Sequence, residues 1–136
     1  MIQVDTINLF GPGAVLHHVG LVVNSIADSF PAAQTVFDPT QDVKIAFVDA
    51  HGLLIELLEP GSPKSPVAAS LKKGTKLVHV CYEVQDIEAA IECGIANSLA
   101  LIAAPVPAVA FEGRRIAWLY HAELGLFELV EAQKRG

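Results

Sequence analysis

Two histidines and two glutamates occupy equivalent places in the two halves of this 136-residue sequence. His18 and Glu56 lie in apolar runs of the first half, and His79 and Glu128 lie in matching runs of the second. An ionised carboxylate that is buried alone is strongly destabilised, and two converging carboxylates also repel each other. A divalent cation removes both penalties, because two carboxylates and two neutral imidazoles balance its charge. We therefore predict that these four residues form a divalent-metal site.

An internal repeat predicts how the four residues are positioned. Residues 16–26 align without a gap on residues 77–87, and residues 44–48 align on residues 115–119. In each half, the second of these runs leads into an apolar stretch that one glutamate interrupts. Each half is therefore expected to supply one histidine and one glutamate from its strands.

The two halves also share one predicted order of elements, a strand, a helix and then three strands. Asn24 and Ser25 are suitable residues to begin a short helix, and Asp86 is suited to cap a helix over about residues 87–93. After this helix, a strand over residues 99–103 is expected to lead into a loop at Pro105–Pro107. The predicted strands comprise residues 16–23, 36–37, 43–48, 53–59, 77–84, 99–103, 114–120 and 125–131. Because strands outnumber helices and hairpins join most of them, we expect an α+β fold with a mainly antiparallel sheet.

The length is that of a single domain, residues 1–136, made of two repeated βαβββ modules. Module one covers about residues 16–60 and module two about residues 77–131. Residues 61–76 form the linker between them, with a short helix expected over residues 66–73. Three lysines near the end of the linker are predicted to be solvated, or else to meet the phosphates of a coenzyme A substrate: Lys72, Lys73 and Lys76.

Composition and charge argue against several classes of function. The hydrophobic fraction is 52%, the charged fraction is 18% and the net charge is −6, which disfavours binding to nucleic acid or to anionic membranes. No apolar run approaches the ~20 residues of a membrane helix, and residues 1–15 do not resemble a signal peptide. Cys81 and Cys93 lack the spacing of a CxxC motif. We expect a cytoplasmic protein without nucleic-acid or membrane partners.

Alternation of side chains along a strand places the candidate ligands on one face. His18 shares its face with Gly20, and His79 shares its face with Cys81, whereas His17 is expected to point the other way. A set of two imidazoles and two carboxylates suits Zn, Ni, Co, Fe or Mn. An octahedral ion held by these four ligands has open positions for substrate oxygens. It could stabilise an enolate while a carboxylate removes a proton beside the carbonyl.

Four short motifs resemble the vicinal oxygen chelate superfamily, which includes glyoxalase I, methylmalonyl-CoA epimerase, extradiol dioxygenases, and fosfomycin and bleomycin resistance proteins. The motifs are His17–Val23, Ile55–Pro60, Val78–Val80 and Phe127–Leu129, and the resemblance extends over residues 16–131. It is strongest with the branch of methylmalonyl-CoA epimerase and glyoxalase I (lactoylglutathione lyase). The resemblance implies a curled sheet around a metal cleft, with these ligands: His18, Glu56, His79 and Glu128. It also implies that a metal-bound glutamate acts as the base, Glu128 first and Glu56 second.

Two departures from the family's pattern concern the walls of the cleft. Residues 25–42 are short and lack the Tyr and Leu-Gly of the usual first helix, and Lys44 stands where the epimerases place another acid. Lys44 and its repeat partner Arg115 are predicted to be cations of the substrate pocket that orient a carboxylate or phosphate. Cys81 is predicted either to line the pocket or to be a small core residue.

Three functions remain open from the sequence. The first is a metal-dependent isomerase or lyase that acts on a small acyl thioester, such as an acyl-CoA, or on a thiol adduct of an oxoaldehyde. The second is a bleomycin-resistance-like protein that binds a small molecule without catalysis, although the complete ligand set favours an enzyme. The third is an Fe(II) extradiol-type dioxygenase, which the second acid disfavours because such sites use two histidines and one carboxylate. A homodimer is also expected, since the exposed strand edges of so apolar a chain need cover.

Overall fold

The computed structural model describes residues 2–134 and contains one eight-stranded sheet with helices packed beside it. The strands are β1 (Val15–Val22), β2 (Val36–Asp38), β3 (Val43–Ala50), β4 (Leu53–Pro60), β5 (Leu77–Val84), β6 (Leu99–Pro107), β7 (Arg115–His121) and β8 (Gly125–Glu131). The helices are α1 (Ile26–Ser29), α2 (Pro66–Lys72), α3 (Ile87–Ala96) and the 3-10 helix η1 (Val109–Phe111). The predicted order of a strand, a helix and three strands therefore occurs twice, with α2 between the two modules.

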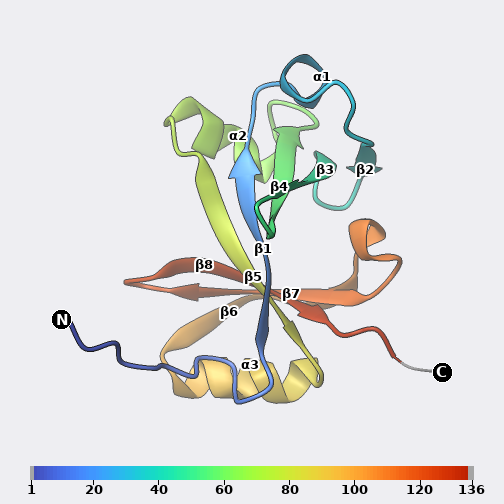
Figure 1. Cartoon of the computed structure of the whole chain (residues 1–136). Helices are drawn as coiled ribbons and strands as arrows, with labels where there is room; N and C mark the ends of the chain where they lie inside the picture. The colour runs from blue at the N-terminus through green and yellow to red at the C-terminus, as the bar shows by residue number, and fades with distance from the viewer. Residues whose placement is uncertain (1, 135–136) are drawn as a thin grey trace.

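The sheet joins the two modules through their first strands. Its order is β2-β3-β4-β1-β5-β8-β7-β6, so β1 and β5 pair antiparallel at the centre. Each of these strands pairs parallel with the last strand of its own module, and the other ladders are antiparallel. Figure 1 shows the two halves of the sheet turned steeply across each other, which gives a curled half-barrel. The predicted α+β class with a mainly antiparallel sheet is confirmed.

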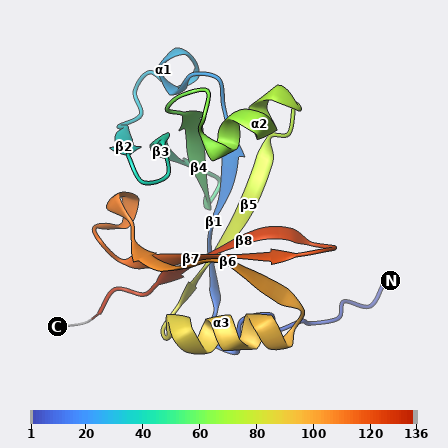
Figure 2. The same ribbon diagram turned by 180° about the vertical axis from the view of Figure 1, so that it is seen from behind.

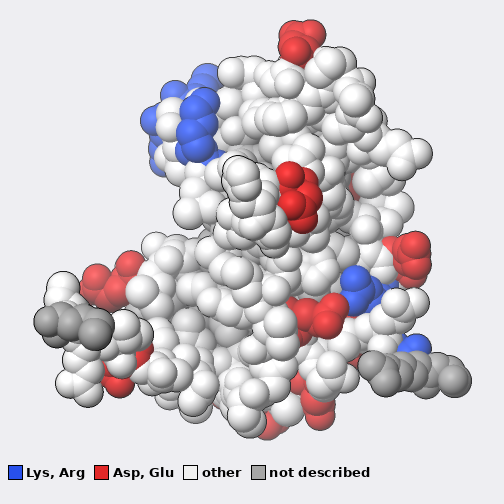
Figure 3. Space-filling model, viewed as in Figure 1, with Lys and Arg blue, Asp and Glu red and all other residues white. Residues whose placement is uncertain are grey.

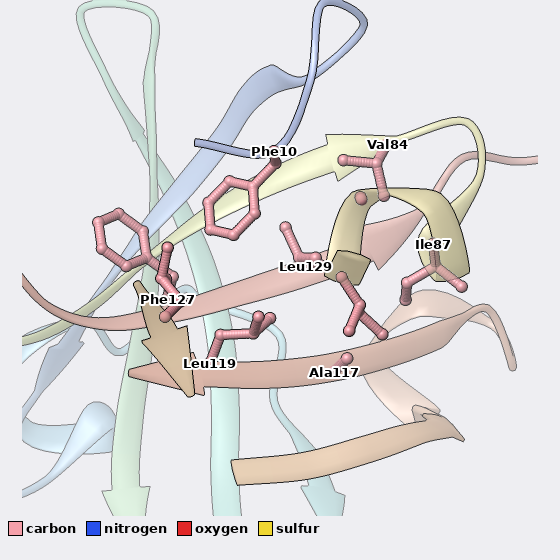
Figure 4. Packing of buried hydrophobic residues seen from close by; sticks show 10 residues of the cluster. Phe10, Val84, Ile87, Ala117, Leu119, Phe127 and Leu129 are labelled. Atoms are coloured by element: carbon pink, nitrogen blue, oxygen red, sulfur yellow. The ribbon is translucent and has the colours of Figure 1, made fainter. Parts of the chain in front are cut away.

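Helices cover one face of each half of the sheet and so direct the acids to the other face. Figure 2 shows α3 on the side of β6, β7 and β8 that faces away from module one. Phe127 and Leu129 pack into the hydrophobic core beneath α3, so Glu128 between them points to the opposite face (Figure 4). In module one, Leu57 packs with Ile26 of α1. Because neighbouring side chains of a strand point to opposite faces, Glu56 points away from α1.

Short polar residues begin both module helices as predicted. The side chains of Ser25 and Asp86 each accept a hydrogen bond from a backbone N–H in the first turn of α1 and α3. Helix α1 ends after four residues, shortly before Pro31, whereas α3 continues to Ala96, beyond the predicted end at residue 93. Among the helices within residues 2–134, none is long and apolar enough to cross a membrane.

The predicted loop at Pro105–Pro107 is wrong, because β6 continues through it. Since β6 is an edge strand, a proline can face away from β7 without removing a ladder hydrogen bond. The pairing with β7 shifts register between Leu101 and Ala103 and again before Val106, so the strand is bulged. Helix η1, which the sequence did not predict, follows at once and carries Phe111 toward the candidate site.

Candidate metal centre

The four predicted ligands lie on four neighbouring strands in the middle of the sheet. Their order across it is Glu56 on β4, His18 on β1, His79 on β5 and Glu128 on β8. Gly20 of β1 pairs with Glu56 on one side and with His79 on the other. All four side chains are buried, and none of the residues exposes more than 3% of its surface. The duplicated strands therefore bring these residues together into one cluster.

The polar atoms of the cluster converge at distances that fit a metal ion. The Nε2 atoms of His18 and His79 are 3.2 Å apart. Glu56 Oε1 lies 3.4 and 3.2 Å from these two atoms, and Glu128 Oε1 lies 3.1 and 3.2 Å from them. Metal–ligand bonds of about 2.0–2.2 Å place neighbouring ligand atoms about 3–3.6 Å apart around one ion. The geometry matches one ion held by two imidazoles and two carboxylates.

One carboxylate oxygen of the cluster has no hydrogen-bond donor within the described residues. This atom, Glu128 Oε1, is buried. A buried acceptor without a donor costs about 1–3 kcal/mol, and more when it is charged. A cation between the side chains would satisfy this oxygen and would also neutralise the repulsion between Glu128 and Glu56. The residues therefore fit a divalent ion, and their nitrogen and oxygen donors suit Zn, Ni, Co, Fe or Mn.

The metal-free cluster holds protons on its imidazoles. Burial alone would lower the pKa of His79, but the nearby carboxylates of Glu128 and Glu56 outweigh it and raise that pKa to about 9. The same balance raises the pKa of His18. Burial alone would raise the pKa of Glu56, but the two histidines outweigh it and lower that pKa to about 2. A metal ion must therefore displace protons from the imidazoles when it binds.

Aromatic rings pack around the two imidazoles. Phe111 stacks on His18 with ring centroids 5.7 Å apart, and Phe47 meets the same imidazole edge-on at 5.6 Å. Trp118 meets His79 edge-on at 4.8 Å. These apolar walls keep water from the cluster, which strengthens electrostatic interactions within it.

Residues 17–118 match the family described as the Glyoxalase/Bleomycin resistance protein/Dioxygenase superfamily. The chain belongs to this superfamily. It is also 30% identical over 129 residues to the mitochondrial methylmalonyl-CoA epimerase of Dictyostelium discoideum, a match that covers 85% of this chain and 77% of that protein. The resemblance inferred from the four sequence motifs is confirmed.

Two solved structures have folds similar to that of this chain. A hypothetical protein from Bacillus halodurans C-125 has a TM-score of 0.75 at 31% identity, over 92% of this chain and 99% of that chain. A methylmalonyl-CoA epimerase from Streptomyces coelicolor, in complex with 2-nitronate-propionyl-CoA, has a TM-score of 0.69 at 20% identity, over 88% of this chain and 97% of that chain. The second likeness shows the fold alone, and the acyl-CoA ligand is that of the Streptomyces protein.

His17 lies beside the cluster, although strict alternation predicts the opposite face. The pairing of β1 with β5 shifts register between Leu16 and His18, so His17 forms a bulge. Its Nδ1 atom lies 2.8 Å from Nδ1 of His18. Burial, followed by the charge of His18, lowers the pKa of His17 and favours a neutral ring. The prediction for His17 was wrong because alternation holds only along a strand without a bulge.

Cys81 lies between the ligand strands and has no exposed surface. It pairs with His18 across β1 and β5 and with Glu128 across β5 and β8. Burial raises the pKa of its thiol well above the usual range, so the thiol stays neutral. It packs with Phe111 and Val130 in a hydrophobic cluster. Cys81 is thus a small core residue that also borders the His/Glu cluster.

The structure does not bring the two predicted pocket cations to the cluster. Lys44 pairs with Glu59 at 3.5 Å, and its side chain is 54% exposed. Arg115 pairs with Glu131 of β8 and with Glu88 in the first turn of α3, each at 2.7 Å. Both cations lie on the helix-covered face of the sheet. Lys44 shares this face with the core residue Ala46, and Arg115 shares it with Ala117.

Two residues near the cluster were not predicted from the sequence. Phe111 comes from the short helix η1, where no periodic pattern marks an apolar residue as inward-facing. Arg114 pairs with Glu83 at 3.0 Å and lies over the Phe111 ring, 5.7 Å from its centroid. Neighbouring residues of an extended chain point to opposite faces, and Arg114, rather than the predicted Arg115, lies beside the site.

Proposed function

We propose that this chain is a divalent-metal-dependent epimerase that acts on a small acyl-CoA of the methylmalonyl-CoA type. The observation that carries the proposal is the buried convergence of two imidazoles and two carboxylates, with one Glu128 oxygen left without a donor in the described residues. The similarity to a relative named methylmalonyl-CoA epimerase supports the choice of substrate. Such a reaction breaks and remakes a C–H bond beside the thioester carbonyl.

In the proposed reaction His18, Glu56, His79 and Glu128 hold the ion. When bound, a divalent ion supplies Lewis acidity to the substrate oxygens and makes the neighbouring C–H bond more acidic. Glu128 is assigned as the base that accepts the proton, with Glu56 as the second candidate. The two acids come from β8 and β4, which flank the histidine strands. Inversion also requires a proton delivered to the opposite face of the planar carbon, and we assign this role to whichever of the two carboxyl groups is not the base.

The rings of Phe47, Phe111 and Trp118 have a proposed part in this reaction. They pack against the ligand imidazoles at centroid distances of 4.8 to 5.7 Å. A proton held on a buried carboxylate exchanges with bulk water only where water can reach it. These apolar walls therefore limit how fast that proton exchanges, and we expect exchange with solvent to accumulate over many turnovers.

Positive charge near α2 supports an anionic substrate such as acyl-CoA. Figure 3 shows lysine side chains gathered over α2, and Lys72 lies in its last turn. A hollow of about 560 Å³ beside α2 is lined by Asn24, Ser62, Ser65 and Lys72, among others. This volume falls within the usual range of small-molecule sites. We therefore expect Lys72→Glu to raise the KM for the acyl-CoA and to leave the metal content unchanged.

The first test is the metal content of untagged protein, measured by mass spectrometry, with His18→Ala and Glu128→Ala as variants. We expect about one divalent ion per chain, lost in both variants. The matched control is Glu123→Gln, which changes an exposed acid in the β7–β8 turn and should keep the ion.

The second test follows the proton. Methylmalonyl-CoA incubated with the metal-loaded protein in deuterated water should take up deuterium beside the carbonyl, as seen by NMR. Protein that takes up none of Zn, Ni, Co, Fe or Mn would contradict the metal site. Protein that binds metal but exchanges no proton would keep the site and contradict the epimerase, and would favour a small-molecule-binding role.

A further inference from the structure

The imidazole ring of His18 makes close polar contact at both of its nitrogen atoms. Its Nε2 atom faces the cluster, 3.2 Å from His79 Nε2 and 3.1 Å from Glu128 Oε1. Its Nδ1 atom faces away from the cluster and lies 2.8 Å from Nδ1 of His17. The second contact has hydrogen-bond length. Because both nitrogen atoms have close polar neighbours, these contacts constrain the orientation of the ring.

Chemistry determines which nitrogen atom carries the proton in each ring. A neutral imidazole binds a metal through a nitrogen lone pair, so a His18 that ligates through Nε2 carries its proton on Nδ1. That N–H then donates to Nδ1 of His17, which must be the acceptor. His17 in turn carries its own proton on Nε2. A single contact thus links the tautomers of the two rings.

The fold holds His17 in place for this contact. The β-bulge at His17 turns its side chain to the side of His18, which a regular strand would not allow. The edge of the His17 ring packs against Phe111 with centroids 5.5 Å apart and an angle of 83° between the planes. Phe111 also stacks on the ring of His18, so the same aromatic residue contacts both imidazoles.

The second module positions its own histidine by other means. The repeat partner of His17 is Val78, whose side chain has no polar atom. The ring of His79 is instead confined between Gly20 and Trp118. The polar contact to His18 is therefore a specific feature of the first module and not a consequence of the repeat.

We propose that His17 is a positioning residue that accepts the Nδ1 proton of His18 and so presents its Nε2 lone pair to the metal ion. This inference rests on the proposed metal site. Groups that orient the ligands of a metal contribute to its affinity, typically by 10- to 100-fold. The acceptor is here a second histidine, adjacent in sequence to the ligand that it orients.

The test compares Zn²⁺ affinities by competition with a chromophoric chelator. His17→Val installs the repeat partner's side chain and removes the acceptor, and we expect it to weaken binding by about 10- to 100-fold. His17→Asn retains an acceptor close to the position of Nδ1 and should recover most of the affinity. His51→Asn is the matched control, because it replaces an exposed imidazole in the β3–β4 turn, where asparagine tolerates the positive φ, and it should leave Zn²⁺ affinity unchanged.

A spectroscopic readout separates positioning from general loss of structure. In ¹⁵N-labelled, Zn²⁺-loaded protein, NMR should find the His18 proton on Nδ1 in the wild type and in His17→Asn. Equal affinities for the wild type and His17→Val would overturn the inference while leaving the proposed function intact. Equal weakening in His17→Val and His17→Asn would also overturn it, because loss of packing then explains both. A wild-type protein that binds no metal would contradict the inference and the metal site together.

Discussion

The imidazole ring of His79 lies over Gly20, its partner across the β1–β5 ladder. A Cβ atom built on Gly20 would overlap this ring, with Nε2 of His79 only 2.7 Å away. The glycine is therefore needed for the close approach of a side chain, since its own backbone does not have a positive φ. The small residue of one module makes room for the candidate ligand of the other.

We expect Gly20→Ala to weaken metal binding about tenfold or more, because the methyl group forces the His79 ring away from the cluster. Zn²⁺ titration against a chelator gives the affinity, and thermal unfolding shows whether the fold persists. Gly13→Ala is the matched control, since a Cβ there meets no described atom within 4 Å. Wild-type affinity in Gly20→Ala would show that His79 can bind the metal ion without lying over Gly20, and would contradict this explanation.

The metal-free protein is expected to lose stability as pH rises from neutral. The pKa of His79 is raised from 6.5 to about 9 in the folded state, so its stabilising proton is fully bound below about pH 6.5 and is lost toward pH 9. Urea unfolding in the presence of EDTA, at several pH values across this interval, measures the effect. His79→Ala should show a flatter dependence. Metal affinity should change in the opposite direction and increase with pH, because binding displaces the proton.

The four cluster residues could be predicted because the repeat placed each of them in a strand equivalent to that of its partner in the other module. Strand alternation then sufficed for Glu56 and Glu128, whose apolar neighbours pack under helices. It failed at His17, because a one-residue bulge reverses the face and leaves no mark in the sequence. The predicted homodimer stays a prediction.

The same alternation explains where the two cations predicted for the substrate pocket lie. Lys44 and Arg115 match in the repeat, which suggests a shared role, and they do share one. Each forms an ion pair on the helix-covered face, away from the His/Glu cluster. Repeat matching identifies equivalent residues, whereas the face that they occupy depends on which neighbours pack beneath a helix.

We therefore expect Lys44→Ala and Arg115→Ala to leave metal content and deuterium exchange close to wild type. Their ion pairs are partly exposed, and such pairs contribute little to stability because water and salt screen them. Urea unfolding and the exchange assay measure the two effects. A large rise in KM for the acyl-CoA in either variant would show that the side chain reaches the substrate after all.

The core beneath α3 is expected to stabilise the fold without affecting the chemistry. Leu129 has no exposed surface and follows Glu128 on the opposite face of β8. Leu129→Ala should lower the free energy of unfolding by about 2–5 kcal/mol, because it leaves a cavity among packed side chains. At a temperature where the variant is folded, its metal content should equal that of the wild type. Loss of the ion would show that the two faces of β8 are not independent.

The assignment of the base is tested by comparing Glu128→Gln with Glu56→Gln at saturating metal. Both amides keep the size of the side chain and remove its charge, so both should weaken metal binding. Only loss of the base should also remove proton abstraction from fully loaded protein. We expect Glu128→Gln to slow deuterium exchange into methylmalonyl-CoA by about 10²–10⁴-fold and Glu56→Gln to slow it less. The reverse order would assign the base to Glu56, and equal effects would indicate that the two carboxylates exchange the proton as a pair.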